Sequence, residues 1–271
     1  MNIVEVQNLS VDFETRRGVV NAVQNLSFEV CDGETLGIVG ESGSGKSVSS
    51  LALMGLLPSN AHITADQMML SRNNLITASE KHKQSLRGSA MGMIFQDPMT
   101  SLNPSYSIGF QLMEVFQAHQ KNLNQKQRFE KSISLLKDVG ISFPEVRMKA
   151  YPHQLSGGMC QRVMIAMAIA CQPQLLIADE PTTALDVTVQ AQILNLLDKL
   201  KVDKKMSMIL ITHDLGVVAQ HSDRLMVMYA GQAVEVGKTK DVIERPSHPY
   251  TQSLLDAYTY IQSERNPRRP R

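Results

Sequence analysis

An eight-residue segment near the start of this chain has the residue types and the spacing of a phosphate-binding loop. Its residues are Gly40, Glu41, Ser42, Gly43, Ser44, Gly45, Lys46 and Ser47. A glycine, four further residues and then Gly-Lys-Ser allow backbone N–H groups to close around phosphate oxygens. We expect the Lys46 ammonium to reach the β- and γ-phosphates and the Ser47 hydroxyl to bind Mg²⁺. The segment therefore predicts a site for a nucleoside triphosphate, ATP or a relative, with Mg²⁺.

The segments on either side of this loop have the patterns needed to position it. Residues 35–39 are short and apolar, as in a buried strand, and 48–57 are compatible with a helix that Pro58 ends. The N-terminus of such a helix adds a partial positive charge beside the phosphates. A glycine-rich turn without a ligand is the alternative, but the strand–loop–helix context favours the phosphate site.

A second cluster indicates what kind of nucleotide-binding protein this is. Ser156, Gly157 and Gly158 follow Leu155 and begin an apolar helix that runs to about Cys171. Taken alone, a serine and glycines at this place indicate only a helix N-cap. Further polar residues follow apolar stretches in a defined order: Gln96 after 91–95, Asp179 and Glu180 after 174–178, then Ala184, Leu185 and Asp186, and finally His213 after 207–212.

This ordered set resembles the nucleotide-binding subunit of an ABC (ATP-binding cassette) transporter, and the resemblance covers about residues 3–257. The resemblance implies an α/β fold: a P-loop NTPase core with a mixed or parallel sheet, an N-terminal antiparallel β region and an inserted α-helical subdomain. It implies one domain over 1–257, with the helical subdomain at about 97–160, followed by a basic tail at 258–271. Helical spacing of Ile108, Leu112 and Phe116 supports the helical insertion.

Hydrophobic periodicity predicts further elements around these motifs. Alternation over 26–30 indicates a strand, and 225–237 are expected to form a hairpin that turns at Ala230 and Gly231. A helix is expected over about 187–201. One face of that helix would carry Val189, Ile193, Leu196 and Leu200.

The resemblance implies catalytic and metal-binding roles for particular residues. Asp179 is expected to hold Mg²⁺ together with Ser47 and Gln96. Glu180 is expected to polarise the attacking water, with Gln96 and His213 as further catalytic residues. In isolation, an Asp-Glu pair at a strand end indicates a solvated loop, and a His-Asp pair indicates a helix cap. The order of the motifs favours the catalytic interpretation.

The resemblance also implies contacts with nucleotide. Phe13 is expected to stack on adenine, the alternative being an ordinary strand-core phenylalanine. Ser156 to Gly158 are expected to bind the γ-phosphate of ATP held by a partner subunit, again through a helix N-terminus. Residues Ala184, Leu185 and Asp186 correspond to the segment called the D-loop in ABC ATPases, and Asp186 is expected to contact the nucleotide. Cys160 occupies a position where relatives usually carry arginine or glutamine, which affects only the fine tuning of this helix.

Five segments, 33–42, 95–104, 151–154, 179–192 and 246–255, further resemble the D-type ATPases of oligopeptide and dipeptide importers. This implies an ATP-hydrolysing subunit that powers peptide import, peripheral on the cytoplasmic face of the bacterial inner membrane. Its partners would be two transmembrane permeases, a second ABC ATPase and an extracytoplasmic solute-binding protein. A nickel or other small-solute importer is an alternative. A soluble ABC ATPase acting on nucleic acid or ribosomes is another, but it would carry coiled coils, zinc insertions or tandem cassettes.

Composition limits the remaining possibilities. The 271 residues carry 27 basic and 26 acidic side chains, a net charge of +1, so we expect no nucleic-acid partner. Cys31, Cys160 and Cys171 lack metal-ligand spacing and are expected to be reduced thiols. No signal-peptide pattern and no apolar run of eighteen residues is present, as expected of a peripheral subunit. The arginine-rich tail has no cysteine, so we expect a solvated end without an iron–sulfur cluster.

Overall fold

The computed structural model describes residues 1–183 and 185–265, which divide into two compact units. Unit 1 comprises residues 1–76 together with the described residues from 209 onward, and unit 2 comprises residues 77–208. Ala184, expected in the D-loop, lies outside the described residues, as do residues 266–271 of the basic tail. The segment 97–160, expected to be helical, belongs wholly to unit 2.

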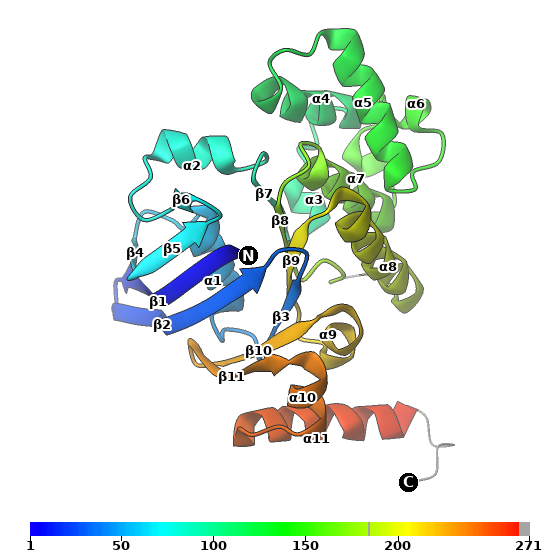
Figure 1. Cartoon of the computed structure of the whole chain (residues 1–271). Helices are drawn as coiled ribbons and strands as arrows, with labels where there is room; N and C mark the ends of the chain where they lie inside the picture. The colour runs from blue at the N-terminus through cyan, green and yellow to red at the C-terminus, as the bar shows by residue number, and fades with distance from the viewer. Residues whose placement is uncertain (184, 266–271) are drawn as a thin grey trace. The chain divides into compact units, whose positions relative to one another are not determined.

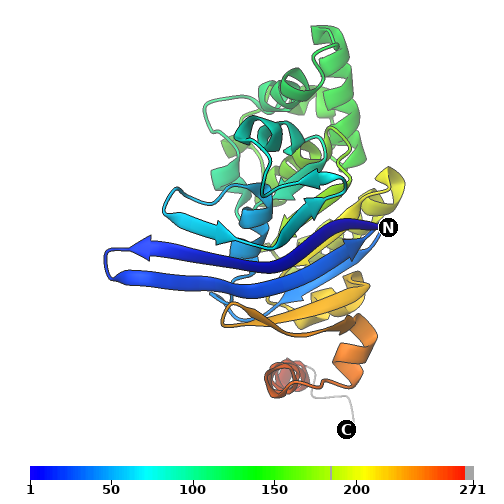
Figure 2. The same ribbon diagram turned by 60° about the vertical axis from the view of Figure 1, so that its left-hand side comes forward.

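An antiparallel sheet forms the N-terminal part of unit 1. Its two long strands, β1 (Asn2–Thr15) and β2 (Gly18–Cys31), pair along their length as the ribbon seen in Figure 2. In β2 the side chains at 26, 28 and 30 are buried and those at 27 and 29 are exposed, which confirms the predicted alternation. Three shorter strands complete the sheet: β4 (Ala61–Thr64), β5 (Gln67–Leu70) and β6 (Asn73–Asn74).

The strand that leads into the phosphate-binding loop lies in a second sheet. This strand, β3 (Thr35–Val39), is buried at all five residues and is parallel to β10 (Arg224–Tyr229). β10 is in turn antiparallel to β11 (Gln232–Lys238). The turn between them has left-handed φ angles at both Ala230 (48°) and Gly231 (82°), the geometry of a tight two-residue hairpin. The predicted hairpin and its turn are confirmed.

The helix after the loop is shorter than the sequence predicted. Helix α1 (Lys46–Met54) begins two residues earlier than expected and ends well before Pro58. Gly55 adopts a left-handed conformation (φ 64°), and its N–H donates to the carbonyls of Ala52 and Leu51. A left-handed glycine satisfies the last helical carbonyls and turns the chain away, so it ends the helix before proline can.

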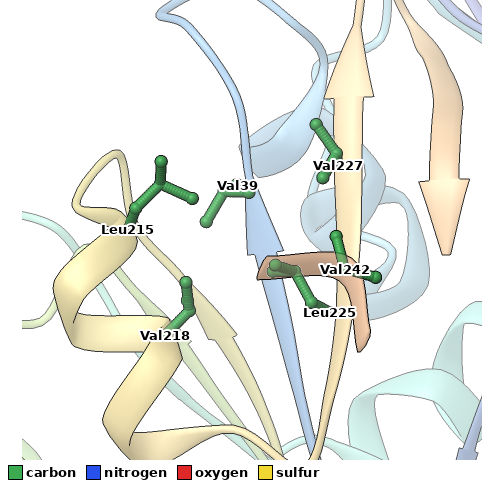
Figure 3. Packing of buried hydrophobic residues seen from close by; sticks show 6 residues of the cluster. All are labelled: Val39, Leu215, Val218, Leu225, Val227 and Val242. Carbon is green, nitrogen blue, oxygen red and sulfur yellow. The ribbon is translucent and has the colours of Figure 1, made fainter. Parts of the chain in front are cut away.

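Three further helices of unit 1 pack on the β3–β10–β11 sheet: α9 (Leu215–His221), α10 (Thr239–Glu244) and α11 (Pro249–Arg265). Figure 3 shows side chains from β3, α9, β10 and α10 pointing toward one another in a buried cluster. Its members are Val39, Leu215, Val218, Leu225, Val227 and Val242. Because Val39 is the last residue of β3, this cluster supports the base of the phosphate-binding loop.

Unit 2 combines parallel strands with a group of helices. β7 (Met91–Ile94) and β8 (Leu175–Asp179) are parallel and buried at every residue, and β9 (Ser207–Ile211) begins in unit 2 and ends in unit 1. Helices α4, α5 and α7 pack against one another (Figure 1). The described part of unit 2 contains these helices: α2 (Glu80–Leu86), α3 (Pro98–Ser101), α4 (Ile108–His119), α5 (Gln125–Asp138), α6 (Pro144–Arg147), a 3₁₀ turn (Pro152–Gln154), α7 (Gly157–Ile169) and α8 (Val187–Lys204).

The buried face of α8 differs from the predicted one. The fully buried residues are Ile193, Leu194, Leu197 and Leu200, whereas Val189 and Leu196 are only partly buried. Helical periodicity allows either of these overlapping stripes, and the packing partners decide which one faces inward. Across the described parts of the chain, no helix has both the length and the hydropathy to cross a bilayer.

Candidate functional site

The phosphate-binding loop needs glycine at particular positions for two separate reasons. Gly40, Gly43 and Gly45 have φ angles of 153°, 82° and 99°, which side-chain-bearing residues rarely adopt. Space is also lacking, because a Cβ at Gly40 would lie 2.1 Å from the Met228 carbonyl oxygen. A Cβ at Gly45 would lie 2.7 Å from the Ala22 carbonyl oxygen. The loop backbone is therefore held closely against neighbouring strands.

The donors that the loop presents suit a polyphosphate anion. The Lys46 side chain is only 5% exposed, and its ammonium donates to the carbonyls of Gly40 and Glu41, each at 2.7 Å. Helix α1 starts at Lys46 after Gly45, which offers no side chain to cap the first N–H groups. Ser47 lies half-buried in the first helical turn. An ammonium, a helix N-terminus and a hydroxyl thus fit a triphosphate and a divalent cation.

The end of β8 carries a carboxylate held by two donors. Asp179 is buried, and the next residue, Glu180, has a left-handed φ of 46°. Its Oε2 accepts hydrogen bonds from Gln96 Nε2 and Thr183 Oγ1, both at 2.9 Å. A left-handed glutamate costs about 1 kcal/mol, so neighbouring interactions must hold it there. The sequence predicted that Gln96 and Glu180 belong to one site, and the structure places them in contact.

The serine–glycine segment begins helix α7 as predicted. Ser156 is the N-cap, and its Oγ accepts the backbone N–H of Met159 at 3.3 Å. Gly157 is exposed, while a Cβ at Gly158 would approach Val189 Cγ1 to 2.9 Å. Close packing on α8 therefore requires glycine at 158.

Two residues just beyond this segment tie α7 to its surroundings. Gln161 is 1% exposed, and its Nε2 donates to the Pro181 carbonyl at 2.6 Å, directly after Glu180. Cys160 is fully buried, and burial raises the pKa of its thiol, which favours the neutral form. The cysteine therefore packs as a small apolar side chain, while Gln161 connects helix α7 to the turn that carries Glu180.

The remaining predicted residues lie as follows. Asp186 is the N-cap of α8, and its Oδ1 accepts the Val189 N–H at 2.9 Å. His213 is exposed between β9 and α9, and the helix cap at that point is the next residue, Asp214. Phe13 is half-buried on β1. Nucleotide contacts by these residues stay predictions.

The predicted site residues fall into both units. Unit 1 contains Phe13, the loop 40–47 and His213, and unit 2 contains Gln96, 156–158, Asp179, Glu180 and Asp186. Sequence reasoning assigned no role to Thr183, to Gln161 or to Tyr250, whose hydroxyl contacts the loop. A hydroxyl three residues after Glu180 was the available signal for Thr183. The contacts of Gln161 and Tyr250 join distant segments and leave no local pattern.

Comparison with known families gives two matches. The family described as "ABC transporter" matches residues 23–183. The family described as "Oligopeptide/dipeptide transporter, C-terminal region" matches residues 234–271. The first match includes the loop, Gln96, the serine–glycine segment 156–158, Asp179 and Glu180, and the second includes Tyr250.

Similar curated proteins agree with these matches. The chain is 56% identical to the dipeptide transport ATP-binding protein DppD of Haemophilus influenzae, over 94% of this chain and 77% of that protein. It is 52% identical to the oligopeptide transport ATP-binding protein OppD of Salmonella typhimurium, over 97% of this chain and 78% of that protein. Among solved structures, a dimeric ATP-binding cassette in a post-hydrolysis state with ADP and Pi has a TM-score of 0.77. It is 24% identical and covers 87% of this chain and 98% of its own, which establishes the fold.

Proposed function

The chain belongs to the ATP-binding subunits of ABC transporters, and we propose that it binds and hydrolyses ATP to power the import of di- or oligopeptides. The substrate class is supported by relatives at 56% and 52% identity, which are dipeptide and oligopeptide transport proteins. The observation that carries the chemistry concerns Glu180. Its carboxylate accepts hydrogen bonds from Gln96 and Thr183, and its backbone is in a strained left-handed conformation.

In this proposal the loop residues hold the triphosphate. The Lys46 ammonium exchanges the loop carbonyls for phosphate oxygens, and the N–H groups at the start of α1 face the same anion. Ser47 and Asp179, assisted by Gln96, hold Mg²⁺, and Phe13 stacks on the adenine. Bound MgATP supplies the γ-phosphoryl group whose transfer to water releases the free energy for transport.

Glu180 is the proposed general base. Its carboxylate orients the attacking water and accepts a proton from it, and His213 helps to keep the water in line. Gln96 and Thr183 both donate to Oε2, which limits rotation of the carboxylate. Fixing the base before reaction avoids the entropic cost of ordering it in the transition state.

A partner ATPase would complete the site. Ser156, Gly157 and Gly158 are exposed or half-buried at the N-terminus of a thirteen-residue helix, and such a terminus attracts an anion. We propose that they bind the γ-phosphate of ATP held by the second ATPase, with Asp186 beside them. The dimeric solved cassette with ADP and Pi supports this arrangement by analogy of fold. Two permeases, a solute-binding protein and the cytoplasmic face of the inner membrane complete the proposed setting.

The proposal is tested with the assembled transporter in detergent and in vesicles. Glu180→Gln should retain ATP binding, reduce hydrolysis about a hundredfold or more and accumulate a closed ATPase dimer. Lys46→Ala should lose ATP binding. Glu130→Gln, at an exposed position on α5, is the matched control and should behave as wild type. Near-normal hydrolysis by Glu180→Gln would exclude Glu180 as the base, and uptake of Ni²⁺ but not of labelled dipeptide would exclude a peptide importer.

A further inference from the structure

A side chain from the C-terminal region contacts the phosphate-binding loop. The backbone N–H of Glu41, the residue after Gly40, donates to the Tyr250 hydroxyl oxygen at 3.2 Å. The two residues are 209 positions apart in the chain. Residues 41–43 of the loop are exposed, so this hydrogen bond holds the part of the loop that neighbouring strands do not cover. Helix α1 holds the end of the loop, and Tyr250 holds its start.

The Tyr250 ring is itself fixed in place. It packs on the Tyr229 ring, with 4.5 Å between ring centroids, and against the buried cluster that includes Val39 of β3, whose members are shown in Figure 3. Burial raises the pKa of the Tyr250 phenol, so the neutral hydroxyl is present at physiological pH. A ring packed on two sides delivers its hydroxyl to one place, because few rotamers remain available to it.

The segment before Tyr250 is anchored by a carboxylate on β11. The two oxygens of Glu235 accept the backbone N–H groups of Ser247 (2.8 Å) and His248 (3.1 Å). The N–H of Tyr250 donates to His248 Nδ1 at 3.2 Å. Burial opposes ionisation of Glu235, but the neighbouring Thr251 side chain and the two N–H groups lower its pKa overall. A charged anchor therefore fixes the segment that presents Tyr250.

We propose that Tyr250 is a positioning residue for nucleotide binding and that residues 246–251 form part of the nucleotide site. By accepting the Glu41 N–H, the Tyr250 hydroxyl holds the start of the loop in the conformation that converges on phosphate. This role rests on the proposed function of the loop. A loop that populates its binding conformation only part of the time binds ligand more weakly by that fraction.

The test is ATP affinity measured by calorimetry on the purified full chain with Mg²⁺. Tyr250→Phe deletes the hydroxyl but keeps the packed ring. Loss of one such hydrogen bond should raise the Kd for ATP about two- to tenfold. Tyr229→Phe removes a hydroxyl from the ring that packs at a tilt against Tyr250, and it is the matched control, expected to bind ATP as wild type. In the assembled transporter, Tyr250→Phe should raise KM for ATP by the same factor and leave kcat within about twofold.

A second variant tests the route through the anchor. Glu235→Gln weakens the contacts to Ser247 and His248, so it should raise the Kd for ATP as well. Because both changes act on one contact, the double variant with Tyr250→Phe should bind no more weakly than the weaker single variant. If the two substitutions had additive effects on the Kd for ATP, Glu235 would not act through Tyr250 and this part of the inference would fall.

The outcomes separate this inference from the proposed function. If wild type binds ATP and Lys46→Ala does not, the loop is the nucleotide site. If Tyr250→Phe then binds ATP as wild type, or loses thermal stability without any change in Kd, Tyr250 serves only packing and the inference falls. If Lys46→Ala binds ATP normally, the proposed function of the loop fails first.

Discussion

Thr183 offers the sharpest test of how the catalytic carboxylate is held. Thr183→Val removes the hydroxyl that donates to Glu180 Oε2 at 2.9 Å and keeps nearly the same shape. A hydrogen bond to a charged group contributes about 1.5–3 kcal/mol. Thr183 is half-buried and Gln96 continues to donate to the same oxygen, so the lower end applies. At about 1.4 kcal/mol per factor of ten, we expect kcat to fall about tenfold.

The assay is steady-state ATP hydrolysis by the assembled transporter over a range of ATP concentrations. KM should change little, because Thr183 acts on the base and not on the loop that holds the phosphates. Thr183→Ser keeps a hydroxyl at the same position and should retain most of the wild-type rate. A Thr183→Val enzyme within twofold of wild type would refute this reasoning, as would a Thr183→Ser enzyme that is equally impaired.

Three further predictions follow from the same geometry. Gly40→Ala should abolish ATP binding, measured by calorimetry, because its Cβ would lie 2.1 Å from the rigid Met228 carbonyl oxygen; tight binding by this variant would contradict the strained loop. Gly158→Ala should lower the free energy of unfolding, measured in urea, by about 1–3 kcal/mol, because the added Cβ would lie 2.9 Å from Val189 Cγ1. Adding Val189→Ala to this variant should restore part of the lost stability. Burial opposes ionisation of Glu235, but the Thr251 side chain and the N–H groups of Ser247 and His248 lower its pKa in the folded state below the ordinary value for a glutamate. Its contribution to stability is therefore present above the ordinary carboxyl range and is lost as the pH falls through the folded-state pKa. Wild type should therefore melt at a higher temperature than Glu235→Gln at pH 7, and the difference in melting temperature should shrink as the pH falls. A difference that stays constant throughout the acid range would exclude this linkage.

Much of the candidate site could be predicted because its signals are local. The loop 40–47 and the cap at Ser156 depend on neighbouring residues, and so does the hairpin turn at Ala230 and Gly231. Backbone angles allowed to glycine, and side chains that cap nearby N–H groups, are set within a few residues. The end of α1 was predicted wrongly: the helix ends at Met54, because Gly55 adopts a left-handed conformation that ends it before Pro58.

The residue types and spacings of the chain by themselves determined that it binds a nucleotide, and they indicated which side chains do the chemistry. Only the tertiary structure decided what holds those side chains. Packing brings Tyr250 to Glu41 across 209 residues and places Gln161 where it donates to the Pro181 carbonyl. It also holds Glu180 in a left-handed backbone conformation that is disfavoured for glutamate. The physical reason is that such contacts depend on where distant elements meet, and no local preference of the chain encodes that position.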